Sequence, residues 1–219
     1  MAKLIQISGL PGTGKTTGLR FLDPKETFVI DCDKKGLSWA GWSKEYNKEN
    51  SNYVATSDIT LIYKALKHIS DNLPHIKYVA IDTINALTSD MVMLEMKKAN
   101  FDQWKELAIS IYELYDMIRS TLRSDLIVFC MAHIEPYDNN GFIHWRTKFD
   151  GKKLTKLNMS GKHNYNLYTK VESQGDGKNT YHLITQSDGT TEARSTMDVL
   201  PYKMENNLLE VAKNIQDKD

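Results

Sequence analysis

The chain has 219 residues, of which 41% are hydrophobic and 26% charged, a composition that suits one α/β domain with a single core. Basic and acidic residues balance at 28 each, so the net charge of zero excludes attraction of the whole molecule to a polyanion. Two cysteines, Cys32 and Cys130, exclude a disulfide framework and are expected to be buried thiols in a reducing compartment. No apolar stretch has the length of a membrane span, and the chain enters its first strand at once. We therefore expect no signal peptide, no membrane partner and a cytoplasmic protein.

Four short apolar runs predict strands that are covered on both faces, because their apolar residues are continuous rather than alternating. Segments with apolar residues at helical spacing lie between them, and this alternation predicts right-handed β-α-β crossovers in a mostly parallel sheet. The predicted strands are Leu4–Ser8, Thr27–Asp33, Lys77–Thr83 and Leu126–His133, and the predicted helices are Thr16–Phe21, Ile59–Asn72 and Phe101–Arg123.

The pattern changes in the C-terminal third of the chain. Turns rich in glycine, asparagine and aspartate occur at residues 138–141, 175–177 and 187–189. The strand-like segments Tyr165–Glu172 and Thr180–Gln186 lie among these turns and predict antiparallel hairpins at the edge of the sheet. Apolar residues at helical spacing predict a closing helix over Glu205–Ile215.

The residues Gly9 to Thr16 form a Gly-x-x-x-x-Gly-Lys-Thr phosphate-binding loop directly after the first predicted strand. Glycines let the backbone wrap round an anion, Lys15 would reach the β- and γ-phosphates, and the Thr16 hydroxyl would hold Mg²⁺. The alternative is a turn of glycine and proline that joins a strand to a helix and binds nothing. We expect ATP and Mg²⁺ as cofactors, and the predicted binding residues are Gly9, Pro11, Gly12, Thr13, Gly14, Lys15, Thr16 and Thr17.

Polar residues end three of the other predicted strands, and in a doubly wound sheet ligands lie outside the carboxyl ends of the strands. Asp82 is expected to orient the Mg²⁺ shell together with Thr16, and its alternative is a plain cap for the following helix. Asp33 could take a proton from an attacking water. Asp31 competes with Asp33 for that role. The alternative for Asp33 is a solvated turn that leads into Lys34-Lys35-Gly36. His133 could contact the γ-phosphate through a neutral imidazole, or it could simply cap its strand.

These stretches resemble the core of the RecA/RadA-type recombinase ATPases. Ile30-Asp31-Cys32-Asp33 resembles an Ile-Asp-Ala-Glu stretch of that family, and residues 80–88, Ala-Ile-Asp-Thr-Ile-Asn-Ala-Leu-Thr, are similar to its Val-Val-Asp-Ser-Val-Ala-Ala-Leu-Thr. The strand that ends at His133 lies where the family ends a strand in a polar residue that senses the γ-phosphate. Among RecA-like proteins the chain is most similar to short phage-encoded ATPases associated with single-strand annealing and recombination.

The resemblance implies a RecA-like P-loop NTPase fold in one domain over residues 1–219, and a place in the host cytoplasm if a phage encodes the protein. Its parts would be a nucleotide-binding core (1–135), a basic loop and β-hairpin region (136–200) and a C-terminal helix (201–219). The implied catalytic residues are Lys15, Asp33, Asp82 and His133. Asp33 replaces the family's glutamate and His133 its usual glutamine. A homo-oligomer, as a ring or short filament, is also implied, although the chain lacks the segment before strand one through which such recombinases polymerise.

The segment Phe142–Lys170 has seven basic residues and one acid, Asp150, so its local charge is seven minus one, or +6. Interleaved aromatic rings complete the composition that single-stranded nucleic acid requires, although an ordinary solvated hairpin would look similar. In RecA-like proteins the loop after the sensor strand binds DNA, so single-stranded DNA is the expected partner and a single-stranded-DNA-binding protein a candidate one. The candidate DNA-binding residues are Arg146, Lys148, Lys152, Lys153 and Lys156.

Two further basic residues are candidates for a cation that acts on the site of a neighbouring subunit, Lys162 and Arg194. The alternative is that each is a plain surface charge.

The leading functional hypothesis is therefore a DNA-stimulated ATPase that acts in phage recombination, annealing or replication. A nucleotide-gated binding module with slow turnover is a second hypothesis. A nucleoside monophosphate kinase is a third, and the five scattered arginines count against it because such enzymes need an arginine-rich acceptor site.

Overall fold

The computed structural model describes residues 1–96, 103–149, 159–175 and 177–218. Nine strands of these residues form one mixed sheet in the order β3-β2-β4-β5-β1-β7-β8-β9, and β6 pairs with β5 outside this path. The strands are β1 (Lys3–Gly9), β2 (Thr27–Asp31), β3 (Tyr53–Ala55), β4 (Tyr78–Asp82), β5 (Ile127–Asn139), β6 (Phe142–Thr147), β7 (Tyr165–Ser173), β8 (Asn179–Ile184) and β9 (Lys203–Glu205). The expected α/β fold with a mostly parallel central sheet is confirmed.

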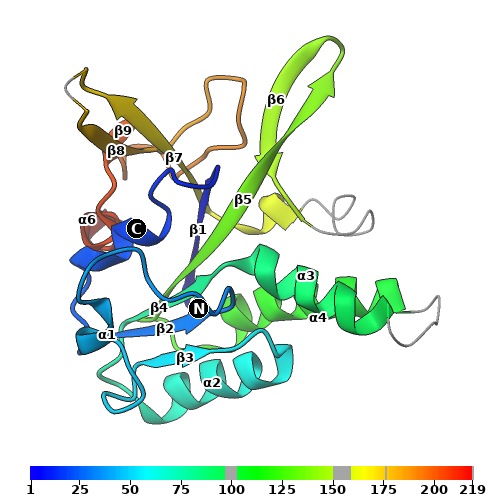
Figure 1. Cartoon of the computed structure of the whole chain (residues 1–219), viewed down its shortest axis with the longest axis vertical. Helices are drawn as coiled ribbons and strands as arrows, with labels where there is room; N and C mark the ends of the chain where they lie inside the picture. The colour runs from blue at the N-terminus through cyan, green and yellow to red at the C-terminus, as the bar shows by residue number, and fades with distance from the viewer. Residues whose placement is uncertain (97–102, 150–158, 176, 219) are drawn as a thin grey trace.

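Six strands, from β3 to β7 along this order, pair in parallel, and β8 and β9 then add antiparallel strands at the edge. Beyond His133 the long strand β5 turns back into β6 through Asn140-Gly141, whose positive φ angles of 56° and 86° suit a two-residue hairpin turn. Figure 1 shows this β5–β6 ribbon projecting away from the helices.

Helices cover both faces of the sheet, and alternate residues of each strand enter two separate cores (Figure 1). On one face Val128 and Cys130 of β5 pack with residues of α2, α3 and α4, and on the other face Phe129 and Met131 pack with residues of η1 and α6. The helices are η1 (Thr16–Phe21), α1 (Trp42–Glu45), α2 (Ile59–Asn72), α3 (Ile84–Met96), α4 (Gln103–Ser120), η2 (Met159–Lys162) and α6 (Leu208–Lys218). None of the helices in the described ranges is long and apolar enough to cross a membrane.

Some expected elements differ from the structure. The strand expected to end at His133 continues to Asn139 as β5, because its outer half pairs with β6. The first helix has the expected bounds but is a 3-10 helix of six residues, and Leu22 after it is extended. The closing helix begins at Leu208 rather than Glu205, since Lys203–Glu205 pairs with β8 as strand β9. Both cysteines are buried and free, as expected.

Strand β2 ends at Asp31 rather than at Asp33, and the Asp31 side chain explains why. Its carboxylate accepts hydrogen bonds from the backbone N–H groups of Lys34 (2.9 Å) and Gly36 (2.7 Å), which fold the chain into a turn. The Tyr53 hydroxyl of β3 donates a third hydrogen bond of 2.7 Å. The turn over residues 32–36 is thus built round one buried carboxylate, which is 1% exposed.

Replacement of this carboxylate tests how firmly the turn is held. We expect Asp31→Ala to lower the free energy of unfolding by about 2 to 3 kcal/mol, because two backbone donors lose a charged acceptor. Tyr53→Phe removes one donor only and should cost about 1 kcal/mol. Urea denaturation at pH 7 measures both, and equal losses in the two variants would show that the turn does not depend on Asp31.

Candidate nucleotide-binding site

The phosphate loop, Asp82 and His133 meet at one edge of the sheet because their strands are parallel and in register. Gly9 at the end of β1 lies opposite His133 of β5, and β5 lies between β1 and the strand that carries Asp82. A cavity of about 400 Å³ opens at this edge. It is lined by the predicted residues Pro11, Gly12, Gly14, Lys15, Thr16, Thr17, Asp82 and His133 and by Lys35, Ser38, Thr83 and Tyr181, which the sequence did not single out.

The C-terminal strands hold the phosphate loop in shape. The Thr13 hydroxyl lies 2.6 Å from the Thr169 hydroxyl of β7, and the Asn206 amide donates a 2.6 Å hydrogen bond to the carbonyl of Gly14. A Cβ atom added at Gly9 would lie 1.9 Å from the Thr169 hydroxyl oxygen, so only glycine fits there. The loop is therefore supported by side chains from the other end of the chain.

Lys15 is almost fully enclosed by the loop, with 6% of its surface exposed. Its ammonium donates hydrogen bonds to the carbonyls of Gly9 (3.0 Å) and Leu10 (2.9 Å) and lies 3.3 Å from Nδ1 of His133. Burial lowers the pKa of Lys15 to about 8, although the negative charge of Asp82 opposes this shift. The ammonium thus lies in the curve of the loop.

Thr16 and Asp82 form the pair predicted to hold Mg²⁺. The Thr16 hydroxyl donates a 2.5 Å hydrogen bond to Oδ2 of Asp82, whose other oxygen, Oδ1, is buried with no hydrogen-bond partner among the described residues. Burial raises the pKa of Asp82 to about 6, and the hydrogen bond from Thr16 opposes that rise. A hydroxyl beside an unpartnered carboxylate oxygen is a set of hard donors that fits Mg²⁺, and the remaining ligands would come from water and phosphate.

Asp31, the last residue of β2, and Asp33, which follows it, have different roles in the fold. Asp31 is fully engaged by the three donors described above, whereas Asp33 contacts residues that line the cavity. Oδ1 of Asp33 accepts a 3.3 Å hydrogen bond from the Thr83 hydroxyl, and Oδ2 forms an ion pair with Lys35. Neither aspartate is itself among the residues that line the cavity, but Asp33 contacts two that are, Lys35 and Thr83. Asp33 therefore stays the candidate for the role expected from the sequence.

His133 is positioned by its backbone as well as by its strand. Its N–H donates a 2.7 Å hydrogen bond to Oδ1 of Asn85, and its carbonyl accepts a 2.7 Å hydrogen bond from the N–H of Lys148. The Asn85 amide also donates a 2.8 Å hydrogen bond to the carbonyl of Lys148. Burial and the nearby Lys15 lower the pKa of His133, which favours the neutral imidazole at pH 7. Asn85 was missed, although it lies in the stretch that resembles the RecA-type family.

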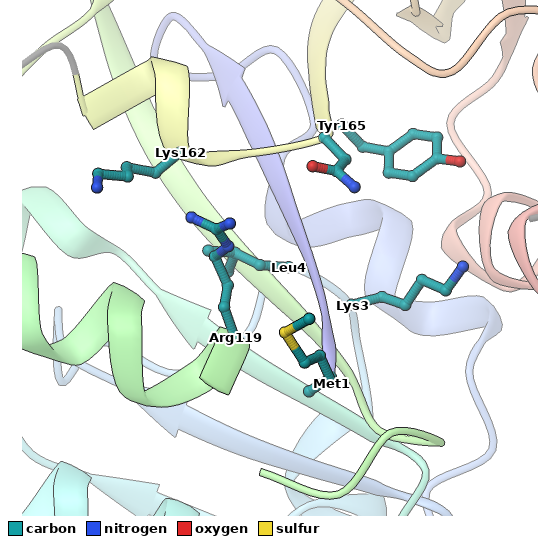
Figure 2. A pocket seen from close by; sticks show the side chains of 8 residues that line it. Met1, Lys3, Leu4, Arg119, Lys162 and Tyr165 are labelled. Atoms are coloured by element: carbon teal, nitrogen blue, oxygen red, sulfur yellow. The ribbon is translucent and has the colours of Figure 1, made fainter. Parts of the chain in front are cut away.

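The remaining candidate residues are not brought to this cavity. Lys162 donates a 2.8 Å hydrogen bond to the Tyr112 hydroxyl and lines a second cavity, beside residues 1–4 at the amino end of β1 (Figure 2). The backbone of Arg194 pairs with Asn166 of β7. Both residues therefore lie outside the site of their own subunit.

The candidate DNA-binding residues lie partly outside the described ranges. Arg146 forms a 2.7 Å ion pair with Glu135 across the β5–β6 ribbon and stacks on Tyr137, 5.1 Å from the ring centroid. Lys148 follows β6, and its side chain is exposed. Lys152, Lys153 and Lys156 lie outside the described residues.

The chain is similar in fold to proteins among the solved structures. No protein family model matches the chain, and no curated protein matches it. A KaiC-like protein from the hyperthermophilic archaeon Pyrococcus horikoshii is similar at 12% sequence identity with a TM-score of 0.49, over 90% of this chain and 82% of that one.

The pKa of Lys15 predicts how nucleotide affinity changes with pH. Below about pH 8 the amine is charged and can pair with phosphate, and above that pH it loses the charge in the free protein. We expect the Kd for Mg-ATP to be flat from pH 7 to 7.5 and to rise above pH 8 by up to about tenfold per pH unit. Lys15→Arg keeps its charge, so any residual binding should be flat over this range. Isothermal titration calorimetry measures both, and a flat wild-type profile would contradict the prediction.

Gly12 and Gly14 provide a matched pair for the packing of the loop. Both have positive φ, at 76° and 92°, but a Cβ atom at Gly14 would lie 2.7 Å from the Tyr181 ring, whereas one at Gly12 has nothing within 4 Å. In the absence of nucleotide, Gly14→Ala should therefore lower the melting temperature more than Gly12→Ala does. Adding Tyr181→Ala should remove part of the difference. Equal melting temperatures for the two glycine variants would be evidence against the contact.

Proposed function

We propose that the protein is a RecA-like P-loop ATPase that binds Mg-ATP at the carboxyl edge of its sheet and hydrolyses it. The observation that supports this most is the Thr16–Asp82 pair beside the enclosed ammonium of Lys15, in which Oδ1 of Asp82 has no partner within the described part of the chain. An ammonium for phosphate and oxygen donors for a hard cation, next to one cavity, are the two requirements of a metal–triphosphate complex.

The surrounding residues define a chemical role for each group. Lys15 would exchange the carbonyls of Gly9 and Leu10 for β- and γ-phosphate oxygens. Thr16 and Asp82 would hold Mg²⁺, which neutralises charge on the phosphates when bound. A water attacks the γ-phosphorus, the bond from that phosphorus to the β–γ bridging oxygen breaks, and Asp33 accepts the proton that the water loses. His133, as a neutral imidazole, would donate a hydrogen bond to a γ-phosphate oxygen.

We further propose that single-stranded DNA is the substrate on which this ATPase acts, in phage recombination, annealing or replication. Phe142 and Ile143 at the tip of the β5–β6 ribbon are 73% and 65% exposed, which suits contact with unstacked bases. The ribbon begins at His133 and returns to it, since the Lys148 N–H binds the His133 carbonyl. A change at His133 would thus reach the ribbon through one hydrogen bond. A homo-oligomer would allow Lys162 or Arg194 to act on a neighbouring site.

One observation favours the second hypothesis, a nucleotide-gated binding module with slow turnover. Oδ2 of Asp33, the group proposed to accept the proton, is engaged by Lys35. A protein that keeps this ion pair while nucleotide is bound would hold ATP as a switch and cleave it slowly.

Hydrolysis and binding assays separate these possibilities. We expect wild-type hydrolysis of ATP to increase several-fold with single-stranded DNA and this increase to weaken with salt, because phosphate contacts release counterions. Lys15→Ala should lose nucleotide binding. Asp33→Asn should bind ATP but cleave it at least about 100-fold more slowly.

Each part of the proposal has its own contrary outcome. No binding of Mg-ATP by the wild type would remove the whole proposal. Binding with turnover that DNA does not change, and no shift of labelled single strands at low salt, would remove the DNA part. Binding with negligible turnover in the wild type, with or without DNA, would favour the gated module.

A further inference from the structure

Two adjacent lysines in the turn after β2 point in different directions. Lys34 has a positive φ of 57°, and its ammonium pairs with Asp90 of α3 at 3.0 Å, away from the cavity. Lys35 lines the cavity and pairs with Asp33. The two side chains are exposed to a similar degree, 49% for Lys34 and 58% for Lys35. They therefore form a natural matched pair in which only one faces the nucleotide site.

The backbone that presents Lys35 is fixed independently of its own ion pair. Asp31 accepts hydrogen bonds from the N–H groups on either side, those of Lys34 and Gly36, and Gly36 has the positive φ of 82° that the turn requires. The ammonium of Lys35 can thus exchange partners without rearranging the turn. The Lys35 side chain is 58% exposed, although Asp33 is 17% exposed, so water can solvate the ammonium when it leaves Asp33.

The charges around Lys35 belong to the phosphate site. Its ammonium interacts electrostatically with Asp33 and Asp82 and with the cation of Lys15, so it lies within range of the groups that would hold the triphosphate. A triphosphate in the cavity adds several negative charges, more than the single charge of Asp33. Lys35 can reach that charge from its own subunit, unlike Lys162 and Arg194.

We propose that Lys35 binds the γ-phosphate within its own subunit and, in doing so, releases Asp33 to accept the proton of the attacking water. Before nucleotide binds, Lys35 neutralises Oδ2 of Asp33 and keeps it from acting as a base. When the triphosphate enters, Lys35 moves from Asp33 to a γ-phosphate oxygen. The product ADP has no γ-phosphate, so after hydrolysis Lys35 pairs with Asp33 again. This inference rests on the proposed ATPase function.

Binding of a slowly hydrolysed triphosphate and of ADP tests the contact with the γ-phosphate. We expect Lys35→Ala to weaken binding of the triphosphate about tenfold, to leave ADP binding within twofold, and to slow single-turnover hydrolysis at least tenfold. Lys34→Ala should change none of these, and Lys35→Arg should keep most of the triphosphate affinity. Melting temperatures of all three variants check that they are folded, which their exposed positions lead us to expect.

A double variant tests the exchange of partners without relying on hydrolysis. If Asp33 and phosphate compete for Lys35, Asp33→Ala should bind the triphosphate several-fold more tightly than the wild type. This gain should disappear in Asp33→Ala combined with Lys35→Ala. A gain that persists in the double variant would show simple removal of negative charge and would overturn the exchange.

The remaining outcomes separate this inference from the function on which it rests. A wild type that binds and cleaves ATP while Lys35→Ala behaves like Lys34→Ala would overturn the role of Lys35 and leave the ATPase intact. A wild type that binds no triphosphate, and that does not differ from Lys15→Ala, would overturn both.

Discussion

Parallel pairing of β1, β5 and β4 is the constraint on which the site depends. Because parallel neighbours run in the same direction, their register alone brings the loop after β1, the imidazole of His133 and the carboxylate of Asp82 to the same edge. An antiparallel β5 would present the opposite end of that strand to the loop. The helices on both faces then bury the strands and leave this edge as the place where polar groups can meet water.

The charged groups at that edge are buried and act on one another, so the pKa of each depends on its neighbours. Asp82 is 2% exposed and Lys15 6% exposed. Burial raises the pKa of Asp82 and lowers the pKa of Lys15, so it favours the neutral form of each group. The charge of Asp82 favours the charged form of Lys15, and the charge of Lys35 favours the charged form of Asp82. Bringing a phosphate and a cation into this set adds one strong charge of each sign, so the polar groups are better compensated with the ligand than without it.

The sequence predicted the parts of this arrangement that depend on local patterns. The loop over Gly9 to Thr16, the strand-end position of Asp82 and helix α2 all follow from spacing within a few residues. His133 was expected to end its strand but lies inside β5, because pairing with β6 extends that strand to Asn139. Strands β3 and β9 have three residues each and contain too few positions for an alternation to be recognised. Asn85, Thr169 and Asn206 contribute through contacts with residues far along the chain, which no local pattern records. For the same reason, the sequence does not show that Lys34 pairs with Asp90 while Lys35 pairs with Asp33 and lines the cavity.

The hydrogen bond from Asn206 to Gly14 joins residues 192 positions apart and has a consequence for how the protein is made. The recognisable phosphate motif leaves the ribosome early, yet the side chains that brace it from β7 and from the segment before α6 are translated much later. A nascent or truncated chain that stops before residue 206 carries every residue of the motif and lacks its support. The shape of the phosphate loop is thereby tied to synthesis of the chain past residue 206.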